Sequence, residues 1–355
     1  MRRFIILAAL MFAGIFAGAK AAPAQSALLN LPLASQGASV TQRLGITDIT
    51  ITYHRPLVNN RKIFGGLVGF GEVWRSGANQ NTTIQFTDPV TVEGQSLAKG
   101  VYGLHMIPGE NSWVVIFSKN STSWGSFTYD QAEDALRVTV RPRAIENQEA
   151  LRYEFDDLQP DSAVIAMRWS TVEVPFKVEV HTHEIVEQSL RNQLRGRPRF
   201  EWQSWTDAAN YLLNNNFDLE EAAKYADHSI DIEDRFENEM TKSRALNALG
   251  HKQEAQAAYD KAIALGNQSQ IHDFGRTLQA QGHQEEAIAL FRRNIQKDPN
   301  SWIGHNDAAR VAVAQGDYTT ALQEMKLAAS ESPESLKSQH LDLVRRLQNK
   351  EDINR

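Results

Sequence analysis

The residues best suited to hold a ligand lie in one short segment, EVWRSGAN at positions 72–79. Trp74 offers a flat apolar face, Arg75 a cation and Asn79 an amide. Because arginine binds carboxylates through two parallel hydrogen bonds, the segment could hold a carboxylate, a sugar or a peptide end. The structural alternative is that Arg75 pairs with Glu72 or caps loop carbonyls, while Trp74 packs in the core.

Three further side chains, those of His54, Arg55 and His105, could extend this binding segment into an enzyme site. Arg75 would orient an anionic group, and His54 or His105 would act as a general base or as a metal ligand. Convergence of these side chains with Asn79 in one pocket would favour an enzyme. Wide separation would count against it.

His181 and His183 form a His-x-His pair, which on a strand would face one side of the sheet. Such a pair could supply two ligands for zinc or copper, with a third from His54 or His105. Exposed or hydrogen-bonded strand histidines give the same pattern. We therefore treat His181 and His183 as metal candidates only, and predict no metal site, cofactor or catalytic residue.

Several kinds of chemistry have no support. The sequence contains no cysteine, which excludes disulfides, thiolate zinc sites and cysteine nucleophiles. It also lacks the Gly-x-Ser-x-Gly, Walker, Gly-x-Gly-x-x-Gly and His-Glu-x-x-His motifs. The acidic groups at 130–134 and 156–157 are typical of a solvated face rather than of paired glycosidase carboxylates.

Short β-strands must position the candidate residues. Strand patterns recur at 48–53, 82–86, 90–92, 100–106, 113–117, 136–141, 151–155, 162–169 and 173–181. These segments alternate apolar and polar residues or form short apolar runs, and turn residues separate them. Many short strands at this spacing predict an antiparallel β-sandwich or barrel.

The same region resembles a bacterial family catalogued as domain of unknown function 2911. The resemblance rests on ordered motifs: YHRP at 53–56, RKIFGGL at 61–67, GEVWRSGAN at 71–79, GVYGL at 100–104, IPG at 107–109, WVVIF at 113–117, WG at 124–125 and VPF at 174–176. It covers roughly residues 39–180. It implies an exported β domain and no assigned activity. FEWQSW at 200–205 and AANY at 208–211 resemble a helical extension that some members carry.

Beyond residue 183 the apolar period becomes helical, and a pattern repeats. Gly250, Gly282 and Gly316 each end a helix, with alanine five residues later and a large apolar residue nine residues later. The alanines are Ala255, Ala287 and Ala321, and the large residues are Tyr259, Phe291 and Met325. This pattern resembles the tetratricopeptide repeat, a pair of helices of about 34 residues. Residues 336–347 would form a terminal capping helix.

The N-terminus has the order of a secretory signal peptide. Arg2 and Arg3 precede an uncharged apolar run at 4–18, and AKA at 19–21 is a small-x-small cleavage site. The apolar run of about 15 residues is short for a membrane span of roughly 20. The net charge of −6 disfavours nucleic acid as the main partner, because phosphate binding needs a basic surface.

We therefore predict a signal peptide at 1–21, a linker at 22–37, a β-sandwich-like domain at 38–182, a connecting helix at 183–199 and tetratricopeptide-like repeats at 200–355. The mature chain would be periplasmic or secreted, with no transmembrane span. The leading hypothesis is a non-enzymatic module that binds a protein or peptide on its repeats. The alternative is a small-molecule or metal-binding enzyme with its site in the β domain. Carbohydrate binding through Trp74 and Trp124 is a third possibility.

Overall fold

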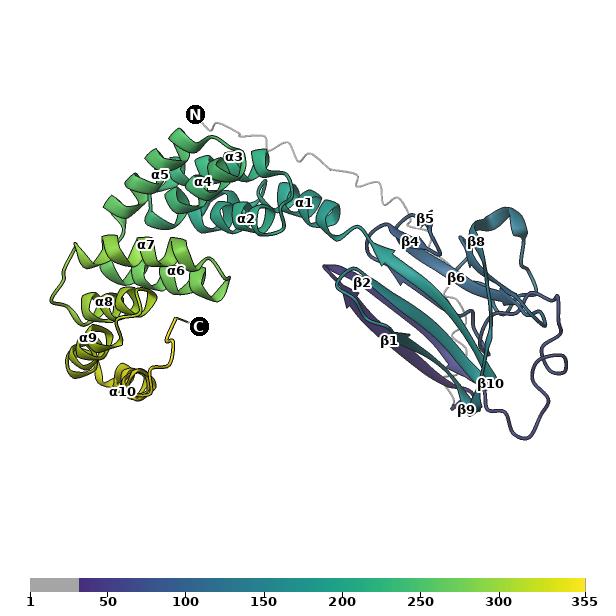
Figure 1. The fold of residues 1–355 in the computed structure, drawn as a ribbon. Helices are drawn as coiled ribbons and strands as arrows, with labels where there is room; N and C mark the ends of the chain where they lie inside the picture. The colour runs from purple at the N-terminus through teal and green to yellow at the C-terminus, as the bar shows by residue number, and fades with distance from the viewer. Residues whose placement is uncertain (1–31, 355) are drawn as a thin grey trace, which may run out of the picture. The chain divides into compact units, whose positions relative to one another are not determined.

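The computed structural model describes residues 32–354. The predicted signal peptide and most of the predicted linker lie outside this range. The described residues form two compact units that divide between Val180 and His181 (Figure 1). One unit is made of strands and the other of helices, and each is described by itself.

The first unit consists of two antiparallel sheets. Its strands are β1 Gln36–Leu44, β2 Thr47–Arg55, β3 Thr83–Phe86, β4 Val90–Val92, β5 Gln95–Leu97, β6 Gly100–Ile107, β7 Trp113–Ser118, β8 Asp134–Val140, β9 Arg143–Asp156 and β10 Ser162–Val180. A six-stranded sheet has the order β1-β2-β3-β6-β7-β8, and a four-stranded sheet has the order β5-β4-β10-β9. A short 3₁₀ turn, Gln131–Glu133, precedes β8.

The core of this unit lies where aromatic side chains of the two sheets meet. Phe117 of β7 and Phe176 of β10 have ring centroids 6.0 Å apart. Phe64 contacts both Trp113 of β7 and Trp169 of β10, at 4.8 and 6.0 Å between centroids. Because each sheet stays open and presents one face to the other, the unit is a sandwich rather than a closed barrel.

Strand β10 differs from its prediction. The sequence predicts two strands, at 162–169 and 173–181, but a single strand of 19 residues spans this region. Ser170 has a φ of 52°, and the register against β9 shifts on both sides of it. A β-bulge thus keeps the strand continuous through a stretch where the alternation breaks. Strands β1 and β5 are not among the predicted strands. Both lie at sheet edges and are rich in polar residues.

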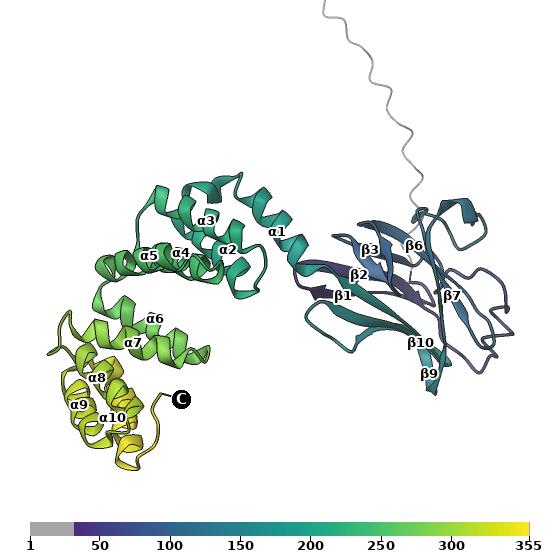
Figure 2. The same ribbon diagram turned by 45° about the horizontal axis from the view of Figure 1, so that its top comes forward.

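The second unit is entirely helical (Figure 2). Its helices are α1 Thr182–Gln193, α2 Trp202–Asn214, α3 Leu219–Ile232, α4 Phe236–Ala248, α5 Lys252–Leu265, α6 Gln268–Ala280, α7 Gln284–Ile295, α8 Trp302–Ala314, α9 Tyr318–Glu331 and α10 Glu334–Gln348, with a 3₁₀ turn at Arg197–Phe200. The strand predicted through His181 is wrong in its last residue, because β10 ends at Val180 and His183 already lies in α1.

The repeat pattern is confirmed in the packing of the helices. Gly250, Gly282 and Gly316 close α4, α6 and α8 with φ values of 84°, 85° and 81°, which glycine adopts without strain. Ala255, Ala287 and Ala321 are buried, so the helices of each pair can approach closely. The unit is therefore a tetratricopeptide-like array. None of the helices between residues 32 and 354 is long and apolar enough to cross a membrane.

Candidate functional site

The predicted 72–79 segment forms one wall of a surface pocket in the β unit. The pocket has a volume of about 180 Å³, and Glu72, Trp74 and Arg75 line it. The opposite wall contains Ser126 and Phe127. The Phe127 side chain is 83% exposed, so a large apolar surface stands next to a cation.

Trp74 fixes this wall to the six-stranded sheet. Its backbone N–H donates to the Met106 carbonyl and its own carbonyl accepts from Met106, both at 2.8 Å. The indole ring stacks on Trp169, with centroids 5.7 Å apart and planes 19° apart. The indole N–H donates to the Gly77 carbonyl at 3.2 Å. Trp74 thus packs against the core and gives the pocket a rigid base.

Arg75 is a half-buried cation with no ion pair among the described residues, Glu72 included. Burial lowers the pKa of its guanidinium, and the buried Nε atom has no hydrogen-bond partner. The guanidinium lies over Gly125, where an added Cβ would come within 2.5 Å of Nη1. Since an unpaired and partly desolvated charge is unfavourable, the pocket is electrostatically suited to an anion.

His105 is a buried residue that contacts the lining of the pocket. Its ring is 2% exposed, and Nδ1 lies 2.9 Å from Oγ of Ser126, which lines the pocket. Burial lowers the pKa of His105 to about 4, so the imidazole is neutral at neutral pH. His105 therefore does not itself line the pocket, but it orients one residue of the wall.

The other three candidates of the β unit are not among the residues that line this pocket. Arg55 donates through Nε to the Leu151 carbonyl at 2.9 Å, and Asn79 donates to the Ser35 carbonyl at 3.2 Å. His54 lies on β2, where burial lowers the pKa of its ring. The structure therefore brings together Glu72, Trp74 and Arg75 but leaves His54, Arg55 and Asn79 outside the pocket lining.

The histidine pair does not have the strand geometry on which its metal hypothesis was based. His181 is the N-cap of α1. His183 lies in the helix, with Nδ1 3.2 Å from the Tyr211 hydroxyl and its ring stacked on Phe217 at 5.4 Å. Among residues 32–354 no group of three histidine or acidic side chains is placed to hold a metal ion.

The larger candidate surface lies in the helical unit, and the sequence analysis did not identify it. A pocket of about 600 Å³ opens between α4, α5, α6 and α7. A second one of about 500 Å³ extends it towards α2. Arg244, Asn247, Leu278 and Glu286 line both, so the two form one groove, which we call the α4–α7 groove.

Arg244 lies at the centre of the α4–α7 groove. Its guanidinium donates to Oδ1 of Asn210 at 3.3 Å and to Oδ1 of Asn214 at 3.0 Å, and both acceptors are neutral amides. Burial lowers its pKa, and the charge of Glu286 opposes that shift. The signal in the sequence was a helical stripe, Met240, Arg244 and Asn247, in which polar residues interrupt an apolar face.

Comparison with known proteins agrees with this division of the chain. Residues 35–178 match the family described as "Protein of unknown function (DUF2911)". No curated protein matches the sequence.

Solved structures match in the helical region. YrrB, described as a tetratricopeptide protein with an unusual peptide-binding site, has 15% identity, covers 44% of this chain and 99% of its own, and has a TM-score of 0.21. MamA has 16% identity over 44% of this chain and 92% of its own, with a TM-score of 0.28. The Cut9–Hcn1 assembly has 18% identity over 46% of this chain and 32% of its own, with a TM-score of 0.28. Residues 35–178 of this chain thus match the DUF2911 family, and the tetratricopeptide-like helix pairs described above follow them.

Proposed function

We propose that this protein is an exported binding protein whose α4–α7 groove takes an extended, acidic segment of a partner protein. The single observation that carries the proposal is Arg244, a half-buried guanidinium that lines both parts of the groove and, among the described residues, donates hydrogen bonds to neutral amides. A carboxylate of the partner would give Arg244 a charged hydrogen-bond acceptor in place of neutral amides. The rings of Tyr259 and Phe274, which are partly exposed, offer apolar lining for neighbouring side chains of the partner.

Charge on the rim supports an acidic ligand. Lys252 and Arg293 line the groove with Arg244, whereas Glu286 is the acidic residue of the lining. Arg293 is already paired with Asp260 at 2.6 Å, so Arg244 and Lys252 are the cations left for a ligand. Rim charges mainly increase the rate of encounter, whereas the buried Arg244 would determine affinity.

The test is cross-linking capture from envelope extract, with the full chain, Arg244→Gln and Arg345→Gln as baits. Gln at 244 can still reach the amides of Asn210 and Asn214 but carries no charge. Arg345 is an exposed arginine of α10, paired only with Asp342, and serves as the matched control. A protein enriched by the wild-type chain and by Arg345→Gln, and lost with Arg244→Gln, supports the proposal. Enrichment that does not depend on Arg244 contradicts it.

Export is the second part of the proposal, and the order of residues at 1–21 supports it. Mass spectrometry of the protein from the producing cell gives the test. Cleavage after Ala21 or near it, together with recovery outside the cytosol, supports export. An intact N-terminus in the cytosolic fraction contradicts it.

The β pocket offers a second candidate function, the binding of a small anion with an apolar part. The unpartnered Nε of Arg75 and the exposed Phe127 favour it. We expect small aromatic carboxylates to raise the unfolding temperature of the chain, and Arg75→Gln to abolish the effect. A rise of equal size in Arg75→Gln would place binding elsewhere.

A further inference from the structure

The end of the described chain folds back onto its own helices. After α10 the backbone turns at Lys350, with a φ of 56°, and the Glu351 N–H donates to the Arg346 carbonyl at 2.9 Å. Residues 351–354, which we call the tail, then return towards α6 and α8 (Figure 1). Ile353 and Asn354 are 1% and 4% exposed, so the tail is seated rather than loose.

The tail is held in the way that a bound peptide is held. The Ile353 side chain packs in an apolar cluster with Val313 of α8 and Leu347 of α10. Its carbonyl accepts from Nη1 of Arg310 at 2.9 Å. The Asn354 amide makes two hydrogen bonds of 2.9 Å, accepting from Gln279 of α6 and donating to the Arg310 carbonyl. The helices thus bind both the backbone and the side chains of the tail. Contacts of both kinds are the basis of sequence-selective peptide binding.

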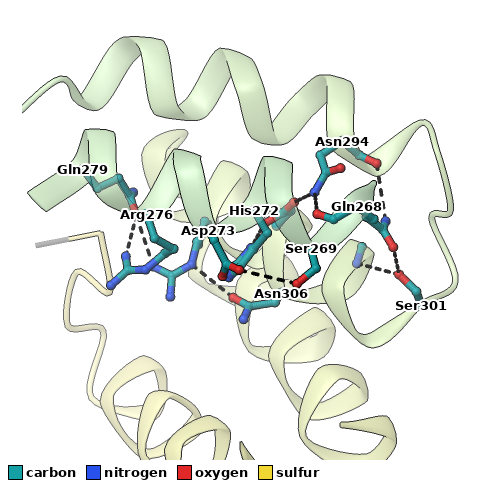
Figure 3. Close-up of polar contacts among 12 residues, drawn as sticks. Gln268, Ser269, His272, Asp273, Arg276, Gln279, Asn294, Ser301 and Asn306 are labelled. Atoms are coloured by element: carbon teal, nitrogen blue, oxygen red, sulfur yellow. Dashed lines mark hydrogen bonds and ion pairs between the residues drawn. The ribbon is translucent and has the colours of Figure 1, made fainter. Parts of the chain in front are cut away.

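Two cations, Arg276 and Arg310, interact in the helices around the tail, and two acids, Asp273 and Asp342, line the same pocket. Arg310 is 3% exposed, and its hydrogen-bond acceptors are neutral oxygens of Asn306, Gln279 and Ile353. Burial and then the neighbouring Arg276 lower its pKa to about 9, while Asp307 and the tail's Asp352 act in the opposite direction. His272 and Asn294, both labelled in Figure 3, already bond Asp307. Asp352 adds a further negative charge that acts on Arg310.

The tail leaves part of this surface unfilled. A pocket of about 380 Å³ lies between α6, α8 and α10, and Arg276, Asn306 and Arg310 line it. His340 also lines the pocket; it is 4% exposed, and its Nδ1 atom has no hydrogen-bond partner among residues 32–354. A ligand longer than the tail would therefore find an unused polar atom on His340 and a second cation, Arg276, next to Arg310.

We propose that the surface of α6, α8 and α10 around Arg310 is a second peptide-recognition site, selective for an acidic–apolar–Asn segment, and that the tail occupies it in cis as a competitor. The inference rests on the proposed function in so far as both assign peptide binding to the repeats. The two sites share no lining residue. The tail competes at an effective concentration on the order of millimolar, so it excludes weaker ligands.

The test measures binding of a fluorescent, amidated peptide of residues 350–355 by anisotropy. The receptors are the full chain and the chain ended after Lys350. We expect the shortened chain to bind the peptide at least about tenfold more tightly than the full chain, because the cis competitor is gone. Replacing Arg310 by Gln in the shortened chain, or the peptide's Asn by Ala, should weaken binding. No binding to the shortened chain, or equal binding to both chains, would overturn the proposal.

A second variant covers the case in which the shortened chain does not fold. Asn354→Ala in the full chain removes both amide bonds but keeps Ile353 in the apolar cluster. We expect faster amide hydrogen exchange in the tail and measurable peptide binding; a folded variant that binds no peptide overturns the proposal. Arg244→Gln separates the two proposals, because it should leave binding of this peptide unchanged while it abolishes partner capture at the α4–α7 groove.

Discussion

The Nδ1 atom of His272 lies 2.5 Å from Oδ1 of Asp307, and both side chains are buried (Figure 3). The second carboxylate oxygen of Asp307 accepts from Nδ2 of Asn294 at 2.7 Å. One carboxylate therefore joins α6, α7 and α8, and each of its oxygens has a partner. These buried bonds hold the three helices at a fixed angle, because none of the three can shift without leaving an oxygen of Asp307 unpaired.

Replacing Asp307 by Ala should destabilise the helical unit by about 3–5 kcal/mol, since His272 and Asn294 would both lose a buried partner. Urea unfolding followed by far-ultraviolet circular dichroism measures the loss. The matched control is Asp317→Ala, because Asp317 is an exposed N-cap that accepts from the Thr320 N–H. Losing a cap costs about 1 kcal/mol. Equal losses in the two variants would show that the buried network contributes little.

Replacing Gly282 by Ala should cost about 1–2 kcal/mol through backbone strain alone. The φ of 85° is unfavourable for an L-residue, yet nothing lies within 4 Å of the added Cβ. Gln281→Ala is the control, since residue 281 has right-handed helical backbone angles. The comparison is made by urea unfolding. A Gly282→Ala chain as stable as the control would contradict the role assigned to the repeat glycines.

Trp74 and Arg75 are neighbours with opposite expected effects on stability. Trp74→Ala should cost about 3–5 kcal/mol, because it removes the ring that stacks on Trp169 and contacts Phe64. Arg75→Gln should change stability by less than about 1 kcal/mol, since Arg75 has no ion pair to lose among the described residues. Hydrogen exchange of peptides from β6 and β7 measures the change in stability of the β unit in each of the two variants. A large loss with Arg75→Gln would make Arg75 a structural residue rather than a ligand contact.

Acid should destabilise the β unit through His105. Its pKa is about 4 in the folded chain, below the ordinary value of 6.5, so the unfolded chain binds more protons between these values. Stability is therefore lost as the pH falls from 6.5 to 4, by up to about 3 kcal/mol. His105→Gln, which keeps a polar group near Ser126, should flatten this pH dependence.

The measurement is the unfolding free energy of the β unit at several pH values, with hydrogen exchange as the probe. His251→Gln, at an exposed helical N-cap, is the control and should leave the slope unchanged. An unaltered slope in His105→Gln would mean that His105 is not the group responsible.

Local sequence pattern was sufficient to predict most of the strands and helices and part of the β pocket. The glycine–alanine spacing predicted the repeats, because helix pairs of fixed length need a turn and a small contact residue at fixed positions. The 72–79 segment contributes four lining residues, Glu72 to Arg75, since neighbours in a loop stay close in any fold. The continuity of β10 through Ser170 could not be predicted in this way, because it depends on pairing with β9.

The sequence by itself determined that strands come first and a helical repeat array follows, because apolar period and turn residues act over a few positions. Only the tertiary structure decided that Arg75 lacks an acidic partner, that Arg244 lies in a groove, and that Arg310 meets Ile353 across 43 residues of chain. Contacts of this kind depend on how whole helices and sheets pack. Packing is a cooperative result of many distant side chains, and no local pattern encodes it.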